Sequence, residues 1–86
     1  MKKILKVVSA EVVGPHSLRV SFNNGVEKQV NLQPLLWGPV FEPLLDPTVF
    51  ARMTLEPSFG VPTWPNGADL APEALLELPD ERGDAA

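Results

Sequence analysis

Two aspartates have neighbours that could support chemistry. Asp46 and Asp69 could converge on a pocket beside Trp64, where a pair of carboxylates would transfer protons or hold a metal ion. Each aspartate is also followed by a proline one to three residues later, a pattern typical of a helix start. Because the helix-cap interpretation explains both residues without a ligand, we favour it and keep the carboxylate pair as the alternative.

Few other residues could carry out catalysis or bind a metal. His16 is the only histidine and the chain has no cysteine, so a metal site of imidazoles and thiolates cannot form. His16 follows Pro15 and is expected in a surface turn. No serine lies in a Gly-x-Ser-x-Gly elbow. We therefore predict no catalytic residue, no cofactor and no metal.

The two tryptophans are the candidates for recognition. Trp64 precedes Pro65 and the Asn66-Gly67 turn, and it is interpreted either as an exposed contact residue or as part of the core. Trp37 lies before Gly38-Pro39, in a loop where exposure is expected. A possible interaction surface therefore comprises Trp64, Asn66, Asp69, Trp37 and Asp46.

Composition limits the partners. The chain has 86 residues and a net charge of −4, and residues 69–86 hold six acidic groups against one basic group. This balance lacks the positive charge that binds phosphates, so nucleic acid is an unlikely ligand and a basic protein a better one. No window reaches the roughly 18 apolar residues of a membrane helix, and we expect a cytoplasmic protein.

The hairpin after residue 17 has a register that the sequence can decide. Ser17 to Phe22 alternates polar and apolar residues, which is typical of a strand with one buried face. A two-residue Asn24-Gly25 turn would place Glu27 opposite Phe22. A three-residue loop with a left-handed Gly25 places Val26 there instead, so the longer loop is predicted.

The other elements follow from composition and turn signals. Strands are predicted at residues 4–13, with a bulge near 9–10, and at 26–30, 51–56 and 61–64. A helical turn is predicted after Asn31, a proline-interrupted segment at 40–45, and a helix that starts at Asp46. A last helix is predicted at 71–78, opened by Asp69 or Ala71. The predicted fold is α+β, with a mostly antiparallel sheet of about five short strands and two or three short helices. Residues 1–78 are expected to form one domain, and residues 79–86 a flexible acidic tail.

Two blocks of the sequence resemble a known family. The first block is Leu18-x-Val20-x-Phe22-x-Asn24-Gly25, followed by Val30-Asn31-Leu32 and Leu35-Leu36. The second block is Phe41-x-Pro43-Leu44-x-Asp46, followed by Phe50 and by Trp64-Pro65-Asn66-Gly67-x-Asp69-Leu70-x-Pro72-Glu73. Over residues 5–78 the chain is similar to the small bacterial domain-of-unknown-function family numbered 2442. Asn31 stands where that family often has aspartate.

The resemblance implies an α+β domain and three possible roles. Members are often encoded beside another short protein, and a toxin–antitoxin-like pairing has been suggested for them. We therefore expect a non-enzymatic interaction module that binds a small basic protein, with a homodimer also possible. Some members carry an added DNA-binding helical domain, so the first alternative is a DNA-associated regulator. The second is a small enzyme or ligand-binding domain that uses Asp46 and Asp69.

Overall fold

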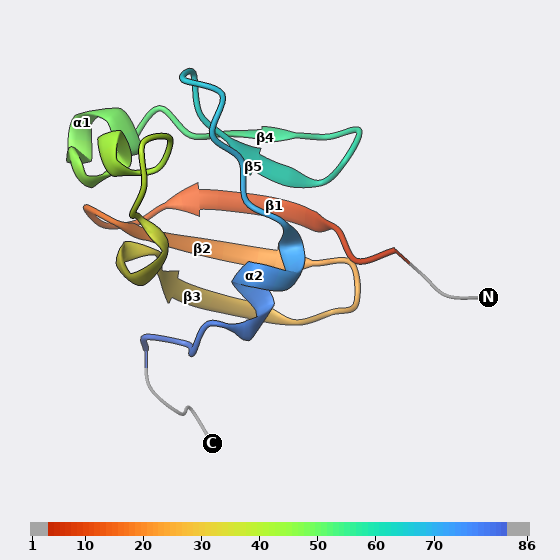
Figure 1. The fold of residues 1–86 in the computed structure, drawn as a ribbon. Helices are drawn as coiled ribbons and strands as arrows, with labels where there is room; N and C mark the ends of the chain where they lie inside the picture. The colour runs from red at the N-terminus through yellow and green to blue at the C-terminus, as the bar shows by residue number, and fades with distance from the viewer. Residues whose placement is uncertain (1–3, 83–86) are drawn as a thin grey trace.

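The strands form two antiparallel sheets. The computed structural model describes residues 4–82 (Figure 1). The larger sheet has the order β1-β2-β3 and consists of β1 (Val7–Val12), β2 (Ser17–Phe22) and β3 (Glu27–Asn31). The smaller sheet pairs β4 (Thr54–Glu56) with β5 (Val61–Thr63), and this hairpin lies against β1. The predicted α+β class with antiparallel strands is confirmed, and its five strands are divided three and two.

Pro62 explains why the two sheets do not merge. Residues 60 and 62 face the same edge of the β5 segment, and the carbonyl oxygen of Gly60 accepts a hydrogen bond of 2.9 Å from the Val7 amide of β1. At the next position on that edge, Pro62 has no N–H to donate. Its carbonyl oxygen instead accepts a bond of 3.2 Å from the Leu70 amide. The ladder between β1 and β5 therefore stops after one bond.

Gly60 lies in close contact with the chain that leads into β1. A Cβ atom at this residue would lie 2.5 Å from the Cβ of Lys6, and the backbone has a φ of +65°. Both the crowding and the left-handed conformation require glycine.

The pairing of β1 with β2 contains an irregularity at Val8. Val7 is opposite Phe22, whereas Ser9 is opposite Ser21, so one residue of β1 is left unpaired. This bulge lets Val7 point into the core while Val8 remains 56% exposed. The bulge predicted near residues 9–10 is therefore present one residue earlier.

The β2–β3 hairpin has the predicted loop. The Phe22 amide donates to the Val26 carbonyl oxygen at 2.8 Å, and Gly25 has a φ of +89°. Leu18 is opposite Val30 in the same register. The buried face of the sheet is thus the apolar face that the alternation indicates.

Short helices connect and cover the sheets. They are the 3-10 helices η1 (Gln33–Leu35) and η2 (Glu42–Leu45), α1 (Pro47–Phe50) and α2 (Pro72–Glu77). The helical turn predicted after Asn31 is present as η1, and Asn31 Oδ1 accepts a hydrogen bond from the Gln33 amide at 2.8 Å, but the N-cap residue is Leu32. Leu75 of α2 belongs to the same buried cluster as the inner residues of β2 and β3, so α2 covers one face of the large sheet. Within residues 4–82 no helix has the length and apolarity needed to cross a membrane.

One continuous core joins all of these elements. Its buried apolar residues are Val7, Leu18, Val20, Phe22, Val30, Leu32, Leu36, Leu44, Phe50, Trp64, Ala68, Leu70 and Leu75.

Candidate functional site

Trp64 lies in the core and not on the surface. Its side chain is 3% exposed, its indole Nε1–H donates to the Phe50 carbonyl oxygen at 2.9 Å, and its ring lies 5.6 Å from that of Phe50. Because its apolar body and its one polar atom are both satisfied internally, Trp64 has almost no surface for a partner. The structure therefore removes Trp64 from the proposed interaction surface and supports the alternative interpretation as a core residue.

The turn after Trp64 is tied to a second loop. The Gly67 amide donates to the Trp64 carbonyl oxygen at 2.9 Å, and Asn66 Oδ1 accepts from the Ala68 amide at 3.1 Å. The other side-chain atom, Asn66 Nδ2, donates to the Val40 carbonyl oxygen at 2.9 Å. A single asparagine thus shapes its own turn and positions the distant segment at residues 37–41.

That segment forms one wall of an apolar cleft. The cleft has a volume of about 390 Å³. Its lining residues come from η1, the following loop, the segment before α2, and α2 itself, and they are Leu35, Trp37, Gly38, Pro39, Val40, Phe41, Leu70 and Ala74. No charged side chain lines it, so the cleft offers an apolar contact and no chemistry of its own.

Trp37 is the most exposed aromatic side chain at this cleft. It is 73% exposed, and Val40 on the same loop is 49% exposed. Gly38 adopts a φ of +88°, and its carbonyl oxygen accepts from the Glu42 amide at 2.9 Å. The loop is therefore a bonded turn, and it holds a large apolar side chain in contact with solvent.

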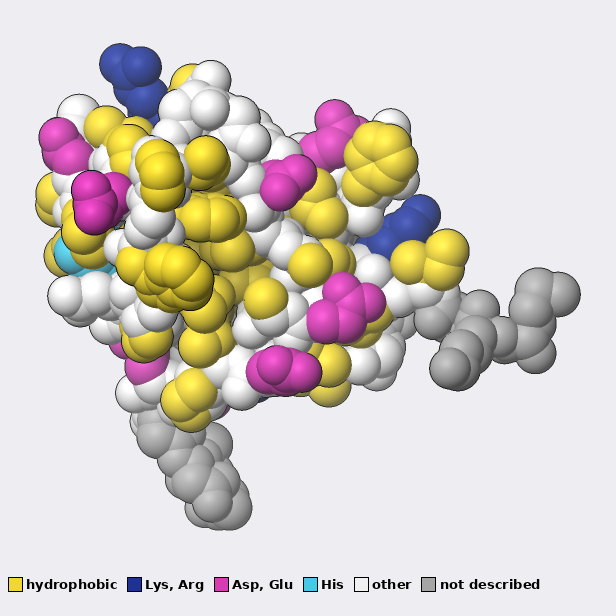
Figure 2. Space-filling view, in the orientation of Figure 1, with side chains coloured by type: hydrophobic (Ala, Val, Ile, Leu, Met, Phe, Trp, Pro, Cys, Tyr) yellow, Lys and Arg dark blue, Asp and Glu magenta, His cyan; other side chains and the backbone are white. Residues whose placement is uncertain are grey.

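Acidic residues surround the apolar surface. Figure 2 shows hydrophobic side chains gathered on this face, with Asp and Glu around them and Lys and Arg only toward its margin. Glu42, Asp69 and Glu73 each adjoin a lining residue in the sequence, and all three are exposed. Negative charge therefore lies near the cleft, on residues that are next to its lining in the sequence.

Asp46 and Asp69 do not meet at the cleft. Asp46 caps α1, since its Oδ1 accepts from the Thr48 amide at 2.9 Å. Asp69 is exposed and forms an isolated bridge with Thr63. The N-cap of α2 is Ala71, and the helix begins at Pro72. Of the two residues predicted to open this helix, Asp69 is thus the wrong one, because its backbone is still paired with the end of β5.

His16 has a structural contact that the sequence did not indicate. Its Nε2 lies 2.7 Å from the Leu45 carbonyl oxygen, and its ring packs edge-on against Phe50 at 6.0 Å. The residue is half-buried and joins the β1–β2 turn to η2. Within residues 4–82 no group of three or more His, Cys, Asp or Glu side chains could hold a metal ion.

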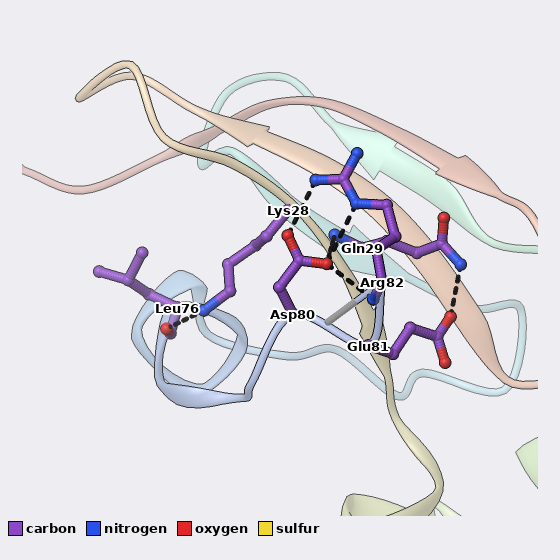
Figure 3. A network of polar contacts seen from close by, with 6 residues as sticks. All are labelled: Lys28, Gln29, Leu76, Asp80, Glu81 and Arg82. Atoms are coloured by element: carbon purple, nitrogen blue, oxygen red, sulfur yellow. Dashed lines mark hydrogen bonds and ion pairs between the residues drawn. The ribbon is translucent and has the colours of Figure 1, made fainter. Parts of the chain in front are cut away.

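A polar network on β3 holds the chain after α2. The Glu81 amide donates to the Gln29 carbonyl oxygen at 2.7 Å, and Gln29 Nε2 donates to Glu81 Oε2 at 2.6 Å (Figure 3). The Gln29 amide donates to Asp80 Oδ1 at 3.4 Å, and Arg82 pairs with Asp80 at 2.9 Å. The segment expected to be a tail from Pro79 therefore includes residues 80–82 bonded to the sheet, and residues 83–86 lie outside the described part.

The network also changes the acidity of its members. The hydrogen bond from Arg82 lowers the pKa of Asp80 well below its usual range, and the same contact raises the pKa of Arg82. Hydrogen bonds from the side chains of Gln29 and then Ser17 lower the pKa of Glu81. Both carboxylates are thus stabilised in the charged form that the network requires.

Sequence reasoning found part of this site. It selected Trp37 and Asn66, which the structure brings to the same loop pair, but it missed the cleft formed by Leu35, Phe41 and Ala74. The available signal was the apolar run between residues 37 and 41, in which glycine and proline prevent a regular helix that would bury it. The bond between Gln29 and Glu81 had no signal in the sequence.

Comparison with known proteins gives the family. No curated protein and no solved structure matches the chain. One family model matches residues 7–79, which is most of the sequence and includes both the hairpin block and the Trp64–Glu73 block. The chain belongs to the family described as protein of unknown function (DUF2442).

Proposed function

We propose that this protein is a non-enzymatic interaction module of the bacterial cytoplasm that binds a small basic protein through its apolar cleft. The observation that carries the proposal is the exposure of Trp37: its side chain is 73% exposed and lines a cleft of about 390 Å³. In the finer form of the proposal the partner is the product of a neighbouring gene, and the pair acts in an antitoxin-like manner.

The composition of the cleft supports a protein partner. Exposed tryptophan is enriched among the residues that contribute most to protein–protein affinity, and such residues lie beside well-packed pockets. Trp37 would cover an apolar side chain of the partner while that side chain fills the space against Phe41 and Leu70. Because Gly38 and Asn66 already fix the loop, binding would cost little ordering entropy.

The charge around the cleft supports a basic partner. Glu42, Asp69 and Glu73 adjoin the lining residues, and their charges would attract lysine or arginine side chains at the rim. These rim charges would mainly increase the association rate and make it depend on salt. The apolar contact would supply most of the lasting affinity.

Neither alternative function gains an observation of its own. The enzyme hypothesis needs Asp46 and Asp69 to share a ligand, but neither lines the cleft and Asp46 caps α1. The hypothesis of a DNA-associated regulator needs a positive surface, whereas the chain carries a net charge of −4.

The test uses a matched pair of exposed aromatic residues. The tagged chain would be used to capture proteins from an extract of its native host, and the captured protein would be purified and titrated against three forms of the chain. These are the wild type, Trp37→Ala, and Phe59→Ala, which removes an aromatic side chain that is 71% exposed and lies outside the cleft. The titration would be repeated at low and physiological salt.

The proposal predicts a specific set of results. One basic protein is captured, Trp37→Ala raises its Kd by about 30-fold, and Phe59→Ala changes the Kd by less than about twofold. Salt lowers the association rate more than it raises the dissociation rate. Capture of no protein at either salt concentration, or equal effects of the two substitutions, would contradict the proposal.

A further inference from the structure

The free edge of β3 is the starting point. In the order β1-β2-β3, one edge of β3 pairs with β2 and the other does not. Val26 and Leu32 bond toward β2 and its adjoining turn, through Phe22 and His16. Because the direction of the backbone groups alternates along an antiparallel strand, the N–H and C=O groups of Glu27, Gln29 and Asn31 point away from β2.

Residues 80–82 occupy the middle of this edge. The Glu81 amide bonds to the Gln29 carbonyl oxygen, as a paired strand would, and the Asp80 carboxylate takes the place of a strand carbonyl by accepting from the Gln29 amide. Lys28 Nζ donates to the Leu76 carbonyl oxygen at 2.6 Å and holds the end of α2 close by. We call residues 80–82 the clasp. It satisfies the groups of Gln29, and within residues 4–82 no hydrogen bond from the clasp reaches the backbone groups of Glu27 and Asn31.

The edge is complementary to a copy of itself. Gln29 lies midway between Glu27 and Asn31, so two antiparallel β3 strands related by a twofold axis at Gln29 would align all three outward positions. In that register Glu27 of one copy faces Asn31 of the other, and Lys28 faces Val30. No like charges are opposed, and β3 has no proline to prevent strand addition.

We propose that the outer edge of β3 is a dimerisation surface for a second copy of this chain, and that the clasp covers it in the monomer. The clasp and the second copy need the same N–H and C=O of Gln29, so they exclude one another. The chain is a monomer while the clasp is closed, and removal of the clasp permits a continuous six-stranded sheet across two copies. This surface is separate from the cleft, so its test does not depend on the identity of the basic partner.

The experiment opens the clasp in the full chain. In the variant Asp80→Ala/Glu81→Pro, the first substitution removes the acceptor for the Gln29 amide and the second removes the N–H that reaches the Gln29 carbonyl oxygen. Glu42→Ala/Glu73→Ala is the control, because it also removes two negative charges but at exposed positions outside the clasp. Sedimentation velocity over a range of protein concentrations measures the mass of each form.

A third variant tests the edge itself. Gln29→Pro in the clasp-opened chain removes the central outward N–H, and proline is tolerated at such an edge position because that N–H does not pair with β2. Far-ultraviolet circular dichroism checks that each variant is folded. Amide exchange of Glu27 and Asn31 in the clasp-opened chain, at low and high protein concentration, gives a second measurement that does not depend on the measured mass.

The expected results separate the dimer edge from a purely structural clasp. Opening the clasp lowers the dimer Kd by about tenfold or more, the control leaves it unchanged, and Gln29→Pro restores the monomer. The amides of Glu27 and Asn31 become protected as the dimer forms. A folded clasp-opened variant that stays monomeric would overturn the proposal, and so would a dimer that survives Gln29→Pro or leaves those two amides unprotected.

Discussion

The two tryptophans have similar sequence neighbours but very different solvent exposure. Trp37 precedes Gly-Pro and Trp64 precedes Pro-Asn-Gly, yet the first is 73% exposed and the second 3%. Trp64 follows β5 and packs on Phe50, so its side chain is held between two elements. Trp37 follows a single turn of 3-10 helix, and its loop bends away before any element can cover it.

This difference assigns a stabilising role to the buried Trp64 and leaves the exposed Trp37 for the proposed recognition of a partner. The turn after Trp64 fixes the position of the loop that carries Trp37, through the hydrogen bond from Asn66 to the Val40 carbonyl oxygen. A residue pattern that looks like a binding motif can thus support an exposed residue elsewhere, in this case the one proposed to bind a partner. Substitutions that alter one tryptophan at a time test this division.

Trp64→Ala should have the largest effect on stability. It removes a buried indole and its hydrogen bond to the Phe50 carbonyl oxygen, and we expect the free energy of unfolding to fall by about 3–5 kcal/mol. Urea denaturation followed by circular dichroism measures the loss. Phe59→Ala is the control and should stay within about 0.5 kcal/mol. Similar losses for the two variants would show that Trp64 is not the support described above.

Substitution of Asn66 should have an intermediate effect on stability, because Asn66 connects the turn after Trp64 to the loop that carries Trp37. Asn66→Ala loses the bond from the Ala68 amide and the bond to the Val40 carbonyl oxygen, at a cost of about 1–2 kcal/mol in unfolding free energy. Asn66→Ser keeps a hydroxyl oxygen that can accept from the Ala68 amide and loses the donor to Val40, so its cost should be about half. Denaturation of the two variants measures both costs, and an unchanged stability in Asn66→Ser would contradict the tether to the cleft loop.

Substitution of Trp37 should have almost no effect on stability. We expect Trp37→Ala to change the free energy of unfolding by less than about 0.5 kcal/mol, since most of its side chain is in solvent. Iodide quenching of fluorescence gives an independent check. Wild-type emission should contain a quenchable part that disappears in Trp37→Phe, while the remaining Trp64 emission resists quenching. Quenching that persists in this variant would place Trp64 in contact with solvent.

Acid should affect the clasp without affecting either tryptophan. The folded pKa of Glu81 is lowered, chiefly by the hydrogen bond from Gln29, so its stabilising contribution is present above the ordinary pKa of about 4.3. That contribution is lost as the pH falls through the lowered pKa. Carboxyl carbon shifts measured by NMR should show Glu81 titrating below its ordinary value, and Gln29→Ala should bring it closer to that value. An ordinary pKa in the wild type would contradict the contact.

The sequence predicted the parts of the fold that depend on local pattern. Alternation in β2 and the left-handed glycine of the Asn24-Gly25 turn determine the hairpin register, because a shift of one residue would bury Glu27. The cap at Asp46 was predicted for the same reason, since its partner is two residues away. Such features are encoded within a few residues of one another.

Contacts between distant segments were not predictable in this way. Whether Pro62 faces β4 or β1 depends on the three-dimensional path of the hairpin, so the division into two sheets could not be inferred from the sequence. The cleft joins η1 to α2, and the clasp joins Gln29 to Glu81 across 52 positions. Apolar residues line the cleft and ordinary polar residues make the clasp, and nothing in their neighbours identifies their partners.

Gly60 has a practical consequence for anyone who diversifies this chain. In a saturation library, position 60 should accept glycine alone, because any Cβ would strike Lys6 at the junction of the two sheets. The adjacent Phe59 is 71% exposed and should accept almost any residue. A peptide inserted for display is therefore best placed before residue 60, because the exposed position 59 tolerates substitution and position 60 does not.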